Sequence, residues 1–314
     1  MKHLLVILTA IISFSAHSQG AEETLPFVAY WSLGDSFVYE VEKTSVKMND
    51  GVITENDTTR YTATFSVVDS TSATYTVSYA IKNDFPSQFG SGEIPEALKK
   101  FEEITLLILT DEFGSFKEIK NWEEVSEKLN NMTNLVVASF VEAGLIKESE
   151  TEAVLKGILA TMVSQQAIEQ LAFQEIQLML FPFGAELSTE ELVYEELLPN
   201  VFGGDPIRAD SRLNISDINR EDDSCIISHS LSVNEKDTKK LIGDLMETMN
   251  LDAADFKKEI NRSKYDMQDV TVSSFNYDYG LPLSVHYTRD FEIVLLGENS
   301  TQLKEIIIEL VEVL

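Results

Sequence analysis

The sequence predicts an α+β fold in which long, curved antiparallel β-sheets pack around a central helical block. Three observations support this prediction. Polar and apolar residues alternate over much of 27–120, as in half-buried strands. Apolar residues recur at helical spacing over 121–181, and strand patterns return over 205–314. Runs of strands on both sides of a helical run favour an antiparallel α+β arrangement over a parallel sheet.

The strands of 27–120 are predicted from alternation and from the turns between them. In 36–48, Phe37, Tyr39 and Val41 occupy alternate positions, and a turn sequence follows at 49–51. Two further strands, rich in β-branched and aromatic residues, flank the polar turn 69–72, so we expect an antiparallel meander. A loop over 85–95 and a short helical stretch near 96–103 precede a hairpin of 104–110 with 116–119.

The helical block is predicted to begin at Trp122, because Asn121 followed by Glu124 forms a capping pattern. Helical spacing continues to about residue 180, and 181–184 ends the block. Ser188 with Glu191 indicates one more short turn or helix.

The last third is predicted to contain strands at 208–218 and 225–233, a helix over 237–260, and a hairpin of 270–279 with 283–296. The final segment, 303–314, fits a helical stripe, but three consecutive isoleucines favour a strand paired with 283–296. A strand pair, a helix and a hairpin occur in this order at 58–120 and again at 208–297. This order raises the hypothesis of an internal duplication.

The first 18 residues predict a signal peptide. Lys2 supplies a positive charge, 4–12 form a short apolar run, and Ala16-His17-Ser18 is a small-x-small cleavage site. We therefore expect an exported protein, periplasmic or secreted, whose mature chain 19–314 forms one domain. No later stretch is both apolar and long enough for a transmembrane span, which needs about 20 residues.

The composition limits the partners and the chemistry. The net charge of −29 argues against binding nucleic acid or anionic membrane surfaces. The sequence contains no nucleotide-binding or serine-hydrolase motif and no clustered zinc ligands, so we expect no cofactor and no metal site. Cys225 and His229 share a strand face but lie about 13 Å apart, too far for a thiol–imidazole pair. We expect a buried, unreactive Cys225, a core or rim His229, and a surface His286.

The helical block supplies the candidate binding residues, because its apolar side chains cover more than one helix face. Within a curved sheet they would either fill the core or line a pocket for an apolar ligand. The pocket candidates are Leu155, Ile158, Met162, Phe173, Met179 and Phe181.

Several phrases resemble a family of uncharacterised exported proteins from Gram-negative envelopes. They are the segments 31–37, 67–79, 110–114 with Asn121-Trp122, 198–200 and 280–283. The layout is also similar, more loosely, to the periplasmic half-barrel carriers of lipids and lipoproteins. The resemblance implies no catalytic residues.

The function expected from these observations is non-enzymatic binding of an apolar, lipid-like ligand within an antiparallel half-barrel. Two alternatives stay open. One is a protein–protein interaction or structural module of the cell envelope. The other is a hydrolase that uses a pair of carboxylates, for which the 53 acidic residues offer no specific pair. The oligomeric state, and the identity of a small-molecule or envelope-protein partner, do not follow from the sequence.

Overall fold

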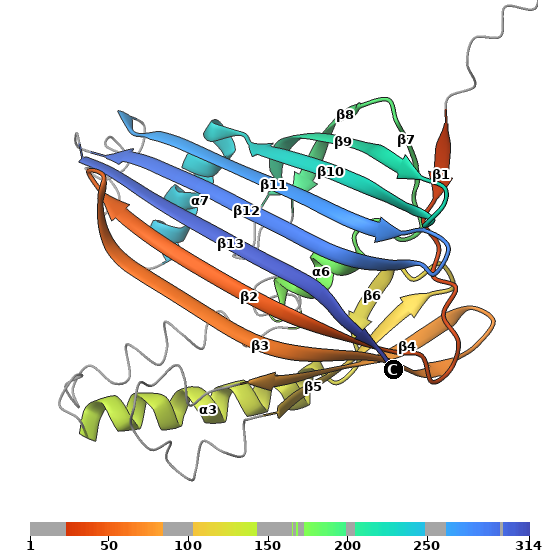
Figure 1. Ribbon diagram of the computed structural model, residues 1–314. Coiled ribbons are helices and arrows are strands. Elements are labelled where there is room, and N and C mark those ends of the chain that lie inside the picture. Colours follow the sequence, from red (N-terminus) through yellow and green to blue (C-terminus); the bar gives the residue numbers. More distant parts are fainter. Residues whose placement is uncertain are drawn as a thin grey trace, which may run out of the picture.

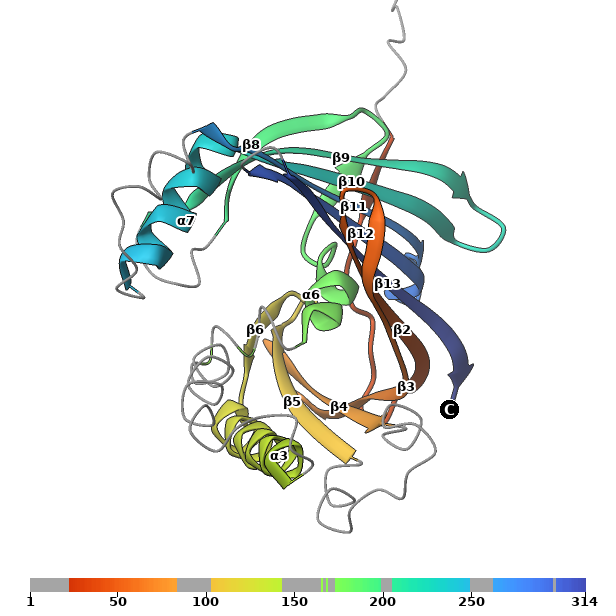
Figure 2. The same cartoon turned by 90° about the vertical axis from the view of Figure 1, so that its left-hand side faces the viewer.

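A computed structural model describes residues 23–83, 103–142, 165, 168, 173–198, 205–248, 262–295 and 298–314. Its main feature is an antiparallel sheet of 11 strands, curved so that α6 lies on its concave face (Figures 1 and 2). In spatial order the strands are β6 (Phe116–Ile119), β5 (Glu103–Asp111), β4 (Thr74–Asn83), β3 (Val52–Ser70), β2 (Ser36–Asn49), β13 (Glu298–Val313), β12 (Leu281–Leu295), β11 (Lys264–Asn276), β10 (Ser224–Val233), β9 (Ile207–Asn219) and β8 (Leu192–Leu198).

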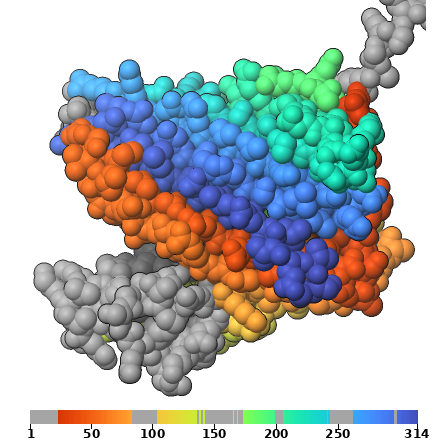
Figure 3. All heavy atoms as spheres, viewed as in Figure 1, coloured from red at the N-terminus to blue at the C-terminus, as the bar shows by residue number. Residues whose placement is uncertain are grey.

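The remaining elements lie around this sheet. Helix α3 (Trp122–Glu142) contacts β5, helix α6 (Gln174–Leu180) contacts β12, and helix α7 (Glu235–Thr248) contacts β9 and β11. Strands β1 (Thr24–Pro26) and β7 (Glu186–Ser188) form a separate two-stranded sheet. Figure 3 shows the outer, convex face, which is a continuous surface of strands.

The core lies on the concave face, because apolar residues alternate inward along nearly every strand. One row of directly opposed residues crosses six strands: Ile215, Ile227, Ser273, Val285, Ile308 and Val41. Five of its six members are apolar, and all six are buried. Such a row binds neighbouring strands through side-chain packing as well as through the backbone ladder.

One end of the sheet, here called the proximal end, carries the turns 111–114 and 277–280. Residues 27–31, the proximal strap, run across it. Ala29 N donates to the Phe113 carbonyl at 2.8 Å, and Trp31 Nε1 donates to the Gly280 carbonyl at 2.8 Å. The Trp31 ring also meets Phe65 and Phe183 edge to face at about 5 Å, so the strap closes this end with aromatic packing.

The large antiparallel sheet predicted from the sequence is confirmed, including the meander of β2–β4, the hairpins around 111–114 and 277–280, and the final strand β13, which pairs with β12. Strands make up 64% and helices 16% of the described residues, so this part of the chain is predominantly β, and an α+β fold with a central helical block is not confirmed. Of that block, α3 and α6 are described. Of the helix expected near 96–103, residues 96–102 lie outside the described residues and 103 is the first residue of β5, and the internal duplication stays a prediction.

Two local predictions require correction. The Asn121 side chain does not cap α3. It accepts a hydrogen bond from Leu107 N at 2.8 Å and donates to the Thr105 carbonyl at 3.0 Å, so it extends the pairing along β5 beyond β6. Of the short turn or helix expected at 188–191, the structure shows a bend at 189–190 rather than a helix, between the end of β7 at Ser188 and the start of β8 at Leu192.

Candidate functional site

Helix α6 positions the candidate site, because its two faces meet different parts of the concave sheet. Residues 174, 177 and 178 follow helical spacing along one face, and Glu175 and Met179 lie on the other. Glu175 is fully buried, where its carboxylate accepts hydrogen bonds from Lys43 Nζ and from the Tyr61 hydroxyl, both at 2.6 Å. The helix is thereby tied to β2 by a partly buried ion pair and to β3 by a hydrogen bond.

The opposite face of α6 borders a cavity of about 370 Å³ between the helix and strands β10–β12. We call it the α6 cavity. Its volume falls within the usual range for small-molecule sites. Apolar side chains form much of its wall: Phe116, Leu178, Leu180, Phe181, Phe183 and Leu231. Polar side chains interrupt this wall on the sheet side: His229, Asp269, Thr271 and Tyr287.

Two buried polar atoms in this lining, His229 Nε2 and the Tyr287 hydroxyl, have no hydrogen-bond partner within the described part of the chain. The His229 ring stacks on Phe181 at 4.8 Å between centroids. Burial lowers the pKa of His229, although the nearby carboxylates of Glu196 and Asp269 oppose the shift, so the imidazole is held neutral. Burial also raises the pKa of Tyr287, which keeps its hydroxyl protonated as a donor.

A second polar row borders the α6 cavity on the side away from the proximal end. Across the strands, Asp269 on β11 lies opposite Arg289 on β12, and Arg289 lies opposite Lys304 on β13. Arg289 donates to both oxygens of Asp269, at 2.7 and 2.6 Å. Its guanidinium also lies over the Tyr287 ring, 5.9 Å from the centroid, so this row continues directly from the cavity wall.

One cluster beside the cavity holds the residue types of a hydrolase, but in a different order. Ser211 Oγ donates to Glu196 Oε2 at 2.8 Å, and His229 Nε2 lies 3.9 Å from the same oxygen. Activation of a serine requires the imidazole between hydroxyl and carboxylate. Here the carboxylate lies between the other two groups, so this cluster does not activate Ser211.

The predicted pocket residues fall in three places. Phe181 lines the rim of the α6 cavity and is 38% exposed. Phe173 and Met179 are buried in the main core instead. Leu155, Ile158 and Met162 lie outside the described residues. Among the residues described, the structure therefore brings only Phe181 into the cavity lining.

Most of the polar half of the site was not predicted from the sequence. The alternation in 283–296 places Tyr287 and Arg289 on one face, which is a signal that the sequence carries. The neighbours Asp269 and Lys304 follow only from the register between strands, which the sequence does not show.

The burial predicted for Cys225 is confirmed, and burial raises the pKa of its thiol to about 11. His286 lies on the outer face as predicted, 2.7 Å from Glu305.

In the described ranges, no group of three or more His, Cys, Asp or Glu side chains is placed to hold a metal ion. No helix in those ranges is long and apolar enough to span a bilayer. Scans of the sequence against protein-family models and against the curated proteins find no match, so they give no support to the resemblance described above.

Proposed function

We propose that the protein binds an apolar, lipid-like molecule in the α6 cavity and carries out no chemistry on it. The observation that carries this proposal is the combination of an apolar wall with two buried polar atoms, on His229 and Tyr287, that lack partners among the described residues. Small-molecule sites typically pair a mostly apolar lining with a few polar groups that orient the ligand. A ligand that supplied these hydrogen bonds would remove the cost of leaving the atoms unpaired.

The sequence supports the same proposal from a different direction. Within the predicted helical block, α6 is described, and it supplies one wall of the cavity. The predicted export signal and the resemblance to half-barrel carriers of the envelope fit a protein that shields an apolar molecule from water. The order of Ser211, Glu196 and His229 favours binding over hydrolysis.

Binding can be measured with N-phenyl-1-naphthylamine, an uncharged probe that becomes fluorescent in apolar surroundings. We expect saturable binding, and Leu178→Trp should weaken it at least tenfold by filling the cavity. Phe181→Ala should weaken it severalfold, because it removes the ring at the rim. The matched control is Leu197→Trp on the outer face of β8, which should leave the affinity unchanged. Equal affinities for all four proteins would refute the α6 cavity as the site.

Mass spectrometry of organic extracts from natively purified protein would then identify what the cavity holds. We expect to recover an apolar small molecule from the wild-type protein. The same molecule should be absent from Leu178→Trp at an equal yield of folded protein. Circular dichroism of each variant separates loss of the ligand from loss of the fold.

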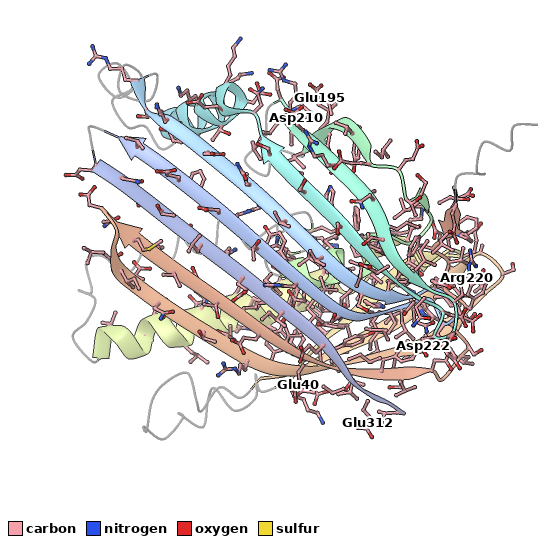
Figure 4. The ribbon with its side chains drawn as sticks, turned by 45° about the horizontal axis from the view of Figure 1, so that its top comes forward. Glu40, Glu195, Asp210, Arg220, Asp222 and Glu312 are labelled. Atoms are coloured by element: carbon pink, nitrogen blue, oxygen red, sulfur yellow. The ribbon has the colours of Figure 1, made fainter. Side chains whose placement is uncertain are left out.

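A second candidate function is assembly through the outer edge of β8. Within the described ranges β8 pairs only with β9, and Leu192, Val193 and Leu197 on it are 55–62% exposed. An exposed apolar edge is a template for another strand. Glu195 and Asp210 lie opposite each other on the neighbouring strands (Figure 4), so two copies of this edge would repel at low salt.

Sedimentation tests this second candidate with a second copy of the chain as the occupant. We expect dimers at high ionic strength, where repulsion is screened, and monomers at low ionic strength. Val193→Lys should abolish the dimer, whereas Val313→Lys, an exposed valine on β13, should not. A monomer under all conditions would remove the β8 edge as a site of self-association.

A further inference from the structure

The row beside the α6 cavity contains an uncompensated positive charge. We call Asp269, Arg289 and Lys304, together with Lys43 one row nearer the proximal end, the charged row. All four lie at inward-facing positions of adjacent strands, and Lys43 lies opposite Ile306, two residues from Lys304 along β13. Three cations therefore gather on one patch of the concave face in a protein whose net charge is −29.

Two of these cations are already neutralised. Arg289 forms a bidentate ion pair with Asp269, and Lys43 forms an ion pair with Glu175. Lys304 has no carboxylate partner among the described residues. The nearest acid in the same cross-strand row on its other side is Asp57, beyond Ser45. Two strand spacings, about 10 Å, separate Asp57 from Lys304, which is too far for an ion pair.

Lys304 is therefore placed unfavourably in the ligand-free protein. Burial lowers the pKa of its ammonium group, and the charges of Arg289 and Lys43 lower it further. Like charges directly opposite each other on adjacent strands destabilise a sheet. An anion at this point would interact with Lys304 and with the guanidinium of Arg289, and would offset both effects.

Building on the proposed function, we infer that the ligand is an amphiphile with a monoanionic headgroup. The apolar chain occupies the α6 cavity, and the headgroup lies at Lys304 and Arg289 with the Tyr287 hydroxyl as a further donor. The single negative charge of the headgroup follows from the charges in this row. Two of its three cations are in ion pairs, which leaves one cation to be neutralised. A fatty-acid carboxylate and the phosphodiester of a lipid share this chemistry.

The test compares ligands that differ only in the headgroup. cis-Parinaric acid, a fluorescent fatty acid, should bind wild type at least tenfold more tightly than the corresponding alcohol, and added salt should reduce this difference. Displacement of the bound probe by oleate, by lysophosphatidylglycerol or by both identifies the source of the anion. Zwitterionic lysophosphatidylcholine should displace it poorly.

The variants locate the charge. Lys304→Gln should lower the affinity for cis-parinaric acid at least tenfold and change the affinity for N-phenyl-1-naphthylamine by less than twofold. Lys304→Arg should retain most of the wild-type affinity for cis-parinaric acid. Lys236→Gln on α7 makes the same charge change at an exposed position and should have no effect. Equal binding of acid and alcohol to wild type, or equal losses of both probes in Lys304→Gln, would overturn the inference. Failure of the uncharged probe to bind wild type would instead overturn the proposed function.

Discussion

At the scale of single residues, Glu175 determines how α6 is held. A buried carboxylate is tolerated only when it is paired and hydrogen-bonded, and Glu175 meets this condition through Lys43 and Tyr61. Removing one partner of a buried pair leaves the other without its counter-charge. The Lys43 side chain is 30% exposed, so water would compensate only part of the loss.

We therefore predict that Glu175→Gln lowers the free energy of unfolding by about 3 kcal/mol. The control is Glu42→Gln on the outer face of β2, which removes an ion pair with Arg60 on β3. Its effect should be much smaller, because water surrounds that pair. Denaturant unfolding measures both variants, and similar losses in the two would show that the buried pair has no special weight.

Cys225 gives a second residue-scale prediction. Its side chain is buried on β10, and burial raises the pKa of its thiol to about 11, so little thiolate forms at neutral pH. A thiol reagent should label native protein slowly and should react at once after denaturant is added. Stoichiometric labelling of folded protein within the mixing time would contradict this prediction.

At the scale of elements, strands with a clear alternation, and the hairpin turns between them, followed from the sequence more reliably than the helix cap and the strand β8. In β2 and β3 the alternation of residues such as Tyr39 and Tyr61 fixed both the strand and its buried face. β8 escaped prediction because Leu192, Val193 and Leu197 show no alternation that marks a buried face. Asn121 is a residue type favoured as a helix N-cap, but its side chain instead forms hydrogen bonds with two backbone groups at the edge of β5. Local sequence does not reveal such tertiary competition.

The turns offer a matched comparison between two glycines with positive φ. A side chain at Gly51 (φ 77°) would meet no atom within 4 Å, whereas a Cβ at Gly280 (φ 64°) would lie 2.3 Å from the Val28 carbonyl oxygen in the proximal strap. We predict that Gly51→Ala costs about 1–2 kcal/mol of stability through backbone strain alone. Gly280→Ala should cost about 1–3 kcal/mol more, because the strap must move. Thermal unfolding tests the order, and equal losses would indicate that the strap gives way freely.

At the scale of the whole molecule, buried tyrosines predict how stability depends on pH. Burial raises the pKa of Tyr39, Tyr61, Tyr79 and Tyr287 above the ordinary value of 10. Above about pH 10 the unfolded chain releases protons that the folded protein retains, so stability falls as pH rises. Below that pH the four groups are protonated in both states, and their contribution is fully present.

Each of these tyrosines should remove about 1.4 kcal/mol per pH unit above pH 10. We expect the protein to unfold at alkaline pH, with tyrosinate absorbance from the buried rings appearing together with the loss of the β-sheet circular dichroism signal. A titration of all ten tyrosines near pH 10 in folded protein would contradict the burial of these four.

The order of strands in the sheet has a consequence for how the chain reaches its native state. Strands β2–β6 pair with their neighbours in sequence, and so do strands β8–β13. The two groups are joined where β2 pairs with β13, at the middle of the sheet. On a ribosome, β13 is the last of these strands to emerge. The strands of each half can therefore pair with one another before β2 pairs with β13. Joining residues about 260 positions apart requires a large loop closure, which makes this step slow. Until β13 pairs with β2, the edges of these two strands stay open, so a chaperone that covers them would protect the chain from aggregation most at this stage.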